Sequence, residues 1–270
     1  MAFPLARLPR LLGAWRAARK GRAGGGTKPR PEGWPRHGRD ESHGIFPRRP
    51  AAARPGRRAA GRRRRRRMST AEVEAGSLAE LAQAEAACTR CPLYLHATQV
   101  VPGEGHRQAR MMVVGEQPGD KEDLAGRPFV GPAGQLFDQI LAEAGIPRGQ
   151  VFVTNAVKHF KFAPRGKRRL HRRPNAGEID RCKWWLGQEL KLVAPAVLVA
   201  MGATAVRSLL GRPATISSLR GEIRRLEGGM PMIVTIHPSW LLRIRDAAER
   251  ETERRRFLAD LKRGWGLVGG

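Results

Sequence analysis

Three side chains of this protein have the chemistry for acid–base or nucleophilic reactions. Glu116 and His237 each follow a short apolar run, and His171 ends the basic segment Lys167–His171. A neutral imidazole is a good nucleophile near pH 7, and a nearby carboxylate can orient it or accept its proton. The pattern therefore indicates a site that combines imidazole and carboxylate chemistry. The simpler explanations are an ordinary Gly-Pro turn around Glu116 and a structural role for each histidine.

An amide and an aromatic ring accompany these residues. Asn155 follows an apolar run, and its carboxamide offers both a donor and an acceptor to a planar polar ligand. Phe129 lies in a loop rich in Gly and Pro, where an exposed ring could stack on a nucleobase. The alternative for Phe129 is a ring that anchors the loop on the core.

Apolar runs alternate with helical periodicity from Met68 onward, and this alternation positions the candidate residues. We predict strands at Met111–Val114, Val151–Thr154, Ala196–Ala200 and Pro231–Ile236, and helices at Leu78–Ala87, Ala133–Ala144, Glu178–Val193, Ala203–Leu210 and from Trp240 to Trp265. The pattern predicts an α/β fold: a three-layer α/β/α sandwich around a central, mostly parallel four-stranded sheet. The carboxyl ends of parallel strands share one edge, so Glu116, Asn155 and His237 should meet there.

The cysteines indicate a metal or redox site. The chain holds three, Cys88, Cys91 and Cys182, and the first two form a C-x-x-C pair. An odd, small number argues against a secreted disulfide scaffold and for a reduced compartment. Three thiolates with one histidine suit zinc as well as an iron–sulfur cluster, so the residue chemistry leaves both metals open.

Residues 1–67 differ in composition from the rest of the chain. They carry 21 Lys+Arg against 3 Asp+Glu, a net charge of +18, whereas residues 68–270 have a net charge of +9. Six consecutive arginines and no sustained apolar periodicity predict a disordered extension before a domain at 68–270. Three interpretations stay open: a mitochondrial presequence, a basic arm for phosphates, or a segment upstream of the natural start at Met68. The chain has no apolar run of about 20 residues, so we expect no membrane span.

Four of these segments resemble the uracil-DNA glycosylase superfamily, in the iron–sulfur branch that includes the family 4 enzymes. Within that branch the chain looks like the UdgX type, which has a Gly-Glu-Gln-Pro-Gly motif and a Lys-Arg-Arg-Ile-His loop. Here the first motif is Gly115–Gly119, and the basic loop reads Lys-Arg-Arg-Leu-His at 167–171. The resemblance spans about residues 78–261, and residues 1–67 have no counterpart in it.

The resemblance implies a role for each residue of the site. Asn155 reads the uracil edge, Phe129 stacks on the flipped base, and His237 donates a hydrogen bond to uracil O2. Glu116 lies near the sugar. His171 attacks C1′ of the sugar in place of water, so the enzyme is joined to its substrate after a single event.

Further residues are carried over as ligands of substrate, DNA and metal. Gln117 belongs to the substrate-binding motif, and Lys167, Arg168 and Arg169 contact DNA. Where the relatives that turn over have a cysteine, this chain has His159. The resemblance implies a [4Fe–4S] cluster, with zinc as the alternative, on Cys88, Cys91, His159 and Cys182.

Three functions stay open. The first is a glycosylase that excises uracil, preferably from single-stranded DNA, and becomes bonded through His171 to the abasic site. The second is an ordinary turnover glycosylase, in which His171 only contacts phosphate. The third is a non-catalytic cluster protein that binds single-stranded DNA. We expect a monomer in the bacterial cytoplasm, associated with the nucleoid.

Overall fold

The computed structural model describes residues 74–268. The predicted extension at 1–67 and the boundary at Met68 lie outside these residues. The contacts of the chain place residues 70–270 in one unit, and all the elements below belong to it.

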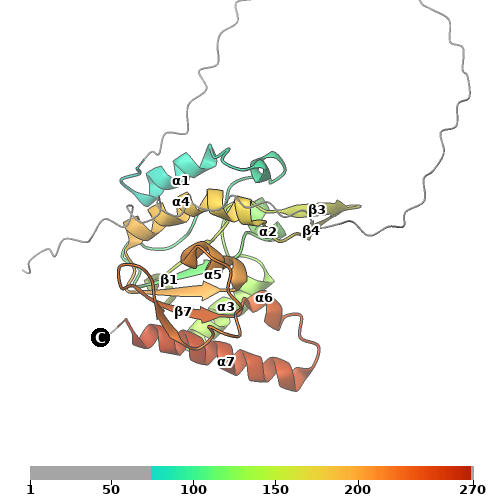
Figure 1. Cartoon of the computed structure of the whole chain (residues 1–270). Coiled ribbons are helices and arrows are strands. Elements are labelled where there is room, and N and C mark those ends of the chain that lie inside the picture. Colours follow the sequence, from blue (N-terminus) through green and yellow to red (C-terminus); the bar gives the residue numbers. More distant parts are fainter. Residues whose placement is uncertain (1–73, 269–270) are drawn as a thin grey trace, which may run out of the picture. The chain divides into compact units, whose positions relative to one another are not determined.

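The central sheet has five strands in the order β2-β1-β5-β7-β6 (Figure 1). Four run parallel, and β6 (Ile223–Arg225) pairs antiparallel with β7 at one edge. The parallel strands are β1 (Met111–Gly115), β2 (Val151–Asn155), β5 (Val197–Met201) and β7 (Pro231–Thr235). The prediction of four strands was therefore wrong by one. All three residues of β6 are exposed, so this strand has neither the apolar run nor the alternation that predicts a strand.

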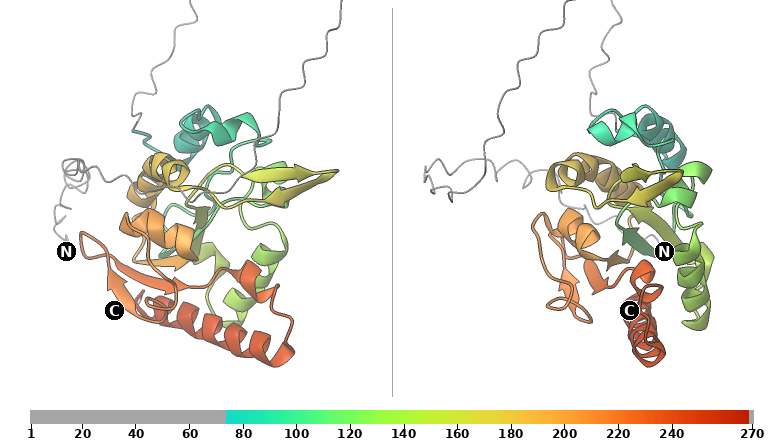
Figure 2. Two further views of the ribbon diagram at one scale, coloured as in Figure 1. Left: turned by 45° about the vertical axis from the view of Figure 1, so that its right-hand side comes forward. Right: turned by 90° about the vertical axis from the view of Figure 1, so that its right-hand side faces the viewer.

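Helices cover both faces of the sheet, which confirms the three-layer α/β/α arrangement (Figure 2). Alternate β1 residues point to opposite faces: Met111 and Val113 pack with α3 and α7, whereas Met112 and Val114 pack with α4 and α5. Because both faces are covered, every β1 residue is buried. The main helices are α1 (Leu78–Ala86), α3 (Pro132–Glu143), α4 (Ala176–Val193), α5 (Ala203–Leu210) and α7 (Ala247–Gly266).

Shorter helices connect these layers. They are the 3-10 helices η2 (Pro92–Leu95) and η3 (Arg148–Gln150) and the α-helices α2 (Asp120–Ala125) and α6 (Pro238–Leu241). In the part of the chain that is described, no helix combines the length and apolar character needed to cross a membrane.

The segment predicted as a basic loop is instead a β-hairpin. β3 (Phe162–Arg165) and β4 (Arg168–His171) pair antiparallel around a turn at Gly166–Lys167, and they extend away from the central sheet (Figure 1). Gly166 has φ +57°, which favours glycine at a hairpin turn. The sequence hides this hairpin because its two strands are only four residues long and half of the residues at 162–171 are charged or histidine.

Candidate active site

Gly115 is the point where the predicted substrate-binding residues meet. It lies beside Asn155 in the register of β1 and β2. A Cβ atom on Gly115 would lie 2.4 Å from Asn155 Oδ1, 3.1 Å from Phe129 Cζ and 3.5 Å from His237 Nε2. The carboxyl edge of the sheet thus brings an amide, an aromatic ring and an imidazole together, and only glycine leaves room between them.

Phe129 is held by its backbone as well as by its ring. It has φ +59°, a left-handed conformation that is rare outside glycine. A Cβ on Gly134 would lie 1.8 Å from the Phe129 carbonyl oxygen, so α3 packs directly on this backbone. Phe129 is 9% exposed, and its ring centroid lies 5.5 Å from that of Phe137 and 6.4 Å from that of His237. Phe129 therefore packs on the core and borders the site at once.

His237 is arranged as a neutral hydrogen-bond donor. The Ser239 backbone N–H donates to His237 Nδ1 at 3.2 Å, so Nδ1 is the unprotonated nitrogen. The ring proton must then reside on Nε2, the atom that faces Gly115. Burial, with smaller contributions from His171 and Arg243, lowers the pKa of His237 to about 4. The imidazole is therefore uncharged at neutral pH, with Nε2–H turned toward the site.

Glu116 and His171 lie at the exposed border of the same site. His171 Nε2 is 3.3 Å from Glu116 Oε1, and the His171 side chain is 52% exposed. Loss of hydration lowers the pKa of His171 more than the carboxylate raises it, and Arg243 lowers it as well. His171 is thus largely neutral near pH 7, which a nucleophile requires.

Gln117 holds the base of the hairpin. Its Nε2 donates to the carbonyls of Lys161 and Arg172, at 3.2 and 3.0 Å, and its Oε1 accepts from the Lys161 backbone N–H at 3.1 Å. Both N–H groups of the amide are therefore used by the hairpin. This geometry gives the Gln117 side chain a positioning role at the hairpin, and its contact with substrate stays a prediction.

Arg169 is a second anchor of the hairpin. Its guanidinium donates to Asp120 Oδ1 at 2.6 Å and to Asp123 Oδ2 at 2.5 Å, and it lies over the rings of Phe160 and Phe162. Its side chain is only 21% exposed. Arg169 and His171 are two residues apart in β4, so they share one face of the hairpin. Fixing Arg169 against α2 therefore turns His171 toward Glu116.

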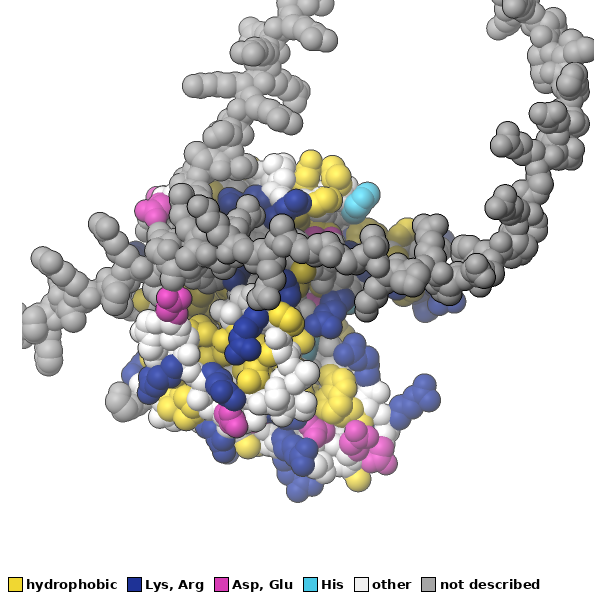
Figure 3. Space-filling view, in the orientation of Figure 1, with side chains coloured by type: hydrophobic (Ala, Val, Ile, Leu, Met, Phe, Trp, Pro, Cys, Tyr) yellow, Lys and Arg dark blue, Asp and Glu magenta, His cyan; other side chains and the backbone are white. Residues whose placement is uncertain are grey.

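The remaining predicted DNA contacts lie at the tip of the hairpin. Lys167 and Arg168 are exposed there, beside the exposed Arg165. More widely, Lys and Arg side chains are spread over the face of the protein seen in Figure 3. The tip can meet phosphates, whereas Arg169 is already engaged with two carboxylates.

The three cysteines lie together in a buried cluster with side chains of α1 and α4. The Trp185 Nε1–H donates to Cys88 Sγ at 3.1 Å, and the Lys158 backbone N–H donates to Cys182 Sγ at 3.2 Å. Burial raises the pKa of the Cys182 thiol to about 12 and also raises the pKa of Cys91. Buried thiols that already accept N–H donors fit a metal or cluster, whose charge would deprotonate them.

His159 is buried and follows Lys158, whose backbone bonds Cys182, but the charge that acts on His159 is that of Asp123. Burial lowers its pKa, so it is neutral as a metal ligand must be, and Asp123 acts on it from α2. Within residues 74–268 no group of three or more Cys, His, Asp or Glu side chains is arranged to hold a metal ion. The chemistry of these donors therefore fits the predicted ligand set. Their positions do not: the four side chains are not gathered around one point, as they would be around a bound metal.

Thr204 and Arg243 contribute to the site and were not predicted. Thr204 Oγ1 donates to Glu116 Oε2 at 2.9 Å, and Arg243 acts on both imidazoles. Thr204 comes shortly after β5, at the same carboxyl edge as the predicted residues. The rule that placed Glu116, Asn155 and His237 would have found Thr204 had it been applied to the third strand as well.

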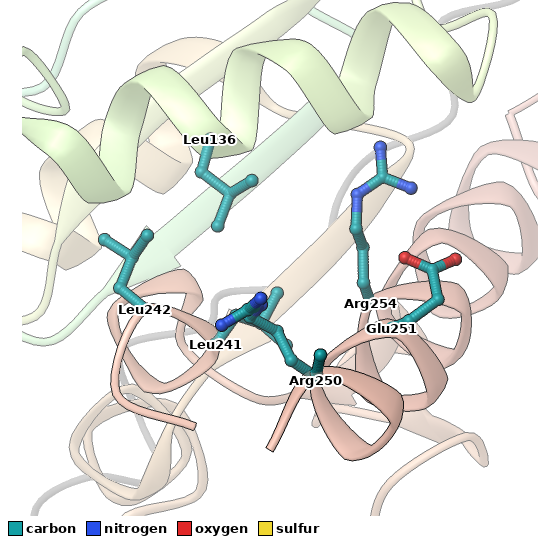
Figure 4. A pocket seen from close by; sticks show the side chains of 7 residues that line it. Leu136, Leu241, Leu242, Arg250, Glu251 and Arg254 are labelled. Atoms are coloured by element: carbon teal, nitrogen blue, oxygen red, sulfur yellow. The ribbon is translucent and has the colours of Figure 1, made fainter. Parts of the chain in front are cut away.

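A pocket in the described region lies apart from these residues, between α3, α6 and α7 (Figure 4). Its lining contains none of the side chains assigned above. It is formed by Leu136, Leu241, Leu242, Ala247, Arg250, Glu251 and Arg254.

Comparison with known proteins agrees with this geometry. The uracil DNA glycosylase superfamily matches residues 102–262. A type-4 uracil-DNA glycosylase of Thermotoga maritima is 40% identical over 174 residues, 64% of this chain and 84% of the relative. A type-4 enzyme of Pyrobaculum aerophilum is 39% identical over 163 residues, 58% of this chain and 80% of the relative. A type-5 enzyme of the same organism is 31% identical over 156 residues, 52% of this chain and 65% of the relative. The chain therefore belongs to the uracil DNA glycosylase superfamily.

Proposed function

We propose that the protein excises uracil from DNA and becomes covalently joined, through His171, to C1′ of the abasic sugar. It would then be a single-turnover enzyme of the UdgX type. Its type-4 relatives carry the first part of this proposal, since they are DNA N-glycosylases that act on uracil. The observation that carries the second part is the 3.3 Å approach of His171 Nε2 to Glu116 Oε1.

Uracil recognition would use the residues around Gly115. A nucleotide must leave the base stack to reach them, and this costs least in single-stranded DNA. The Asn155 carboxamide can pair with the edge of the flipped base, and Phe129 can pack against its face. Since Asn155 is 3% exposed, its donor and acceptor are available in a site with little competing water.

The leaving group would be stabilised by His237. As the C1′–N1 bond breaks, its electron pair leaves with uracil, and negative charge develops on O2. The neutral His237 offers Nε2–H to that oxygen without losing its own proton. A donor already aimed at a developing charge is one of the largest contributions to catalysis, worth about 3 kcal/mol in comparable sites.

The covalent step follows at the sugar. A lone pair of the His171 imidazole forms a bond to C1′, while the charge of Glu116 stabilises the oxocarbenium character of the sugar. The imidazole then carries the positive charge, and its N–H proton passes to Glu116 or to water. Uracil takes a proton from water. The product is a neutral alkylated imidazole without a water-labile ester, so the bond persists.

The hairpin would also bind DNA. Lys167 and Arg168 at its tip can neutralise phosphates next to the flipped nucleotide, and the net charge of +9 on residues 68–270 favours approach to DNA. We propose a preference for single-stranded DNA, where flipping a nucleotide costs least, and a monomeric enzyme.

The buried cysteines would hold a [4Fe–4S] cluster. Its ligands are Cys88, Cys91, His159 and Cys182, and the N–H donors to two of the sulfurs support this set. A bound cluster would tie the segment of Cys88 and Cys91 to α4. The test is the iron, sulfide and zinc content of protein purified without oxygen; zinc in place of iron contradicts the assignment.

A denaturing gel tests the proposed function. The protein is mixed with a single-stranded oligonucleotide that contains one uracil, beside a uracil-free control. A detergent-stable band of protein and DNA, seen only with uracil, is the expected result. Strand breakage after alkali without such a band would show an ordinary turnover glycosylase, and no uracil release at all would show a DNA-binding protein.

The His171→Ser variant separates excision from attachment. We expect it to release uracil without forming the adduct, because water then occupies the position of the imidazole. It should also turn over more than once, which free uracil in excess of enzyme would measure. An adduct that persists in this variant would reject His171 as the nucleophile.

A further inference from the structure

Thr204 lies in the first turn of α5, where its side chain is fully buried. Its Oγ1 donates to Glu116 Oε2 at 2.9 Å, and the other oxygen of this carboxylate, Oε1, lies 3.3 Å from His171 Nε2. The two oxygens of the Glu116 carboxylate thus face different partners, one on α5 and one on β4. Thr204 occupies one oxygen and leaves the other turned toward His171.

The direction of the Thr204 hydroxyl is set by Arg173. The Arg173 Nε–H lies 3.4 Å from Thr204 Oγ1 and can only donate. The oxygen of the hydroxyl therefore accepts from Arg173, and its hydrogen is directed to Glu116. Arg173 comes two residues after His171, so the end of the hairpin supports the same carboxylate that faces the imidazole.

We propose that Thr204 is a positioning residue for Glu116, which fixes the carboxylate so that Oε1 faces both His171 and the sugar C1′. Without this hydrogen bond the side chain of Glu116 is free to rotate toward solvent, since it is 22% exposed. A misplaced charge stabilises the transition state much less than an oriented one. This inference rests on the proposed function and extends it to the residue that orients the carboxylate.

A purely structural role is the competing explanation, because a buried hydroxyl usually needs a partner. Ser208 argues against that requirement. It lies one turn later on α5 and is 1% exposed, yet its Oγ has no hydrogen-bond partner among the described residues. The same helix thus holds a buried hydroxyl that makes no direct hydrogen bond to a described residue. Ser208 also provides a matched control on the same helix.

The test compares Thr204→Val, Thr204→Ser and Ser208→Ala in the full chain. Uracil release and adduct formation are measured at saturating single-stranded DNA, and affinity is measured with a uracil-free oligonucleotide. We expect Thr204→Val to slow both rates about tenfold to hundredfold, the cost of one hydrogen bond to a charged group, with affinity unchanged. Thr204→Ser should restore the wild-type rate, and Ser208→Ala should keep it.

A second comparison removes the effect of folding. Thr204→Val is made in the Glu116→Gln background, where we expect no further loss, because Thr204 acts through the carboxylate. Full activity of Thr204→Val, slow release by Thr204→Ser, or equal slowing by Ser208→Ala would overturn the proposal. If the wild type releases uracil and forms no adduct, the covalent function fails on its own, and the ratio of Val to Ser release rates still decides the role of Thr204.

Discussion

Asp123 and Arg169 lie 46 residues apart in the sequence and form an ion pair at 2.5 Å that joins α2 to the hairpin. The carboxylate is fully buried and the guanidinium is 21% exposed. Asp123 also accepts from the Thr98 backbone N–H, so the charge on α2 is surrounded by donors. This pair decides where the hairpin, and with it His171, is held.

Removing the guanidinium should therefore destabilise the protein. We expect Arg169→Met to lower the free energy of unfolding by about 3 kcal/mol, because it leaves the Asp123 charge buried without its partner. The double variant Arg169→Met, Asp123→Asn should recover part of this loss. Urea unfolding of the two single variants and the double variant measures the coupling, and simple additivity would show that the two groups do not interact.

The exposed tip of the hairpin should behave differently. We expect Lys167→Ala and Arg168→Ala to leave stability unchanged and each to reduce the slope of log affinity against log salt by about 0.7 on single-stranded DNA. Lys262→Ala is the control, because Lys262 is exposed on α7 far from the hairpin: Gly264, two residues later, lies beside Met111 at the amino end of β1. Binding titrations at several salt concentrations give the slopes. A slope equal to that of the Lys262 control would remove the tip from the DNA interface.

The histidine at the end of β7 makes stability depend on pH. Burial lowers the pKa of His237 to about 4, below its ordinary value of 6.5, so the unfolded chain binds this proton more readily. The neutral His237 therefore contributes about 2 to 3 kcal/mol to the free energy of unfolding above pH 6.5, and this contribution is lost as the pH falls toward 4. His237→Asn can keep the cap on Ser239 and cannot titrate. The difference between the urea midpoints of the wild type and of His237→Asn should shrink as the pH falls from 6.5 to 4. A constant difference would contradict the lowered pKa.

A glycine in α3 should be essential for the position of Phe129. We expect Gly134→Ala to lower the free energy of unfolding by about 2 kcal/mol and to slow uracil release, since its Cβ would collide with the Phe129 backbone. Gly187→Ala in α4 is the matched control, because nothing lies within 4 Å of its added Cβ. That variant should gain about 0.5 to 1 kcal/mol. Unfolding of both variants in urea checks the pair, and similar effects would contradict the close contact.

Parts of the fold were predictable because the physics is local. The parallel strands are covered on both faces, so each one is a continuous apolar run, and three of the four placed a candidate residue at the same edge. The strands β3, β4 and β6 are only three or four residues long and each contains arginine, so no periodicity marked them. The hairpin that presents His171 was for this reason taken for a loop.

The partners of the site residues could not be predicted in the same way. Arg169 has the composition of a phosphate contact, and only the position of α2 makes it a structural anchor. Gln117 likewise belongs to a motif suited to substrate, yet its side-chain amide donates hydrogen bonds to the carbonyls of Lys161 and Arg172. Such assignments depend on which residues meet across the fold, and one sequence does not contain that information.

The hairpin enters and leaves the body of the protein at nearly the same place. The Arg172 backbone N–H donates to the Lys161 carbonyl at 2.8 Å, so the two ends of the segment 162–171 are already joined. A chain without that segment could close there with its sheet, Asn155 and His237 unchanged. Under the proposed function, self-attachment is an accessory that one insertion adds to, or one deletion removes from, an ordinary base-excising fold.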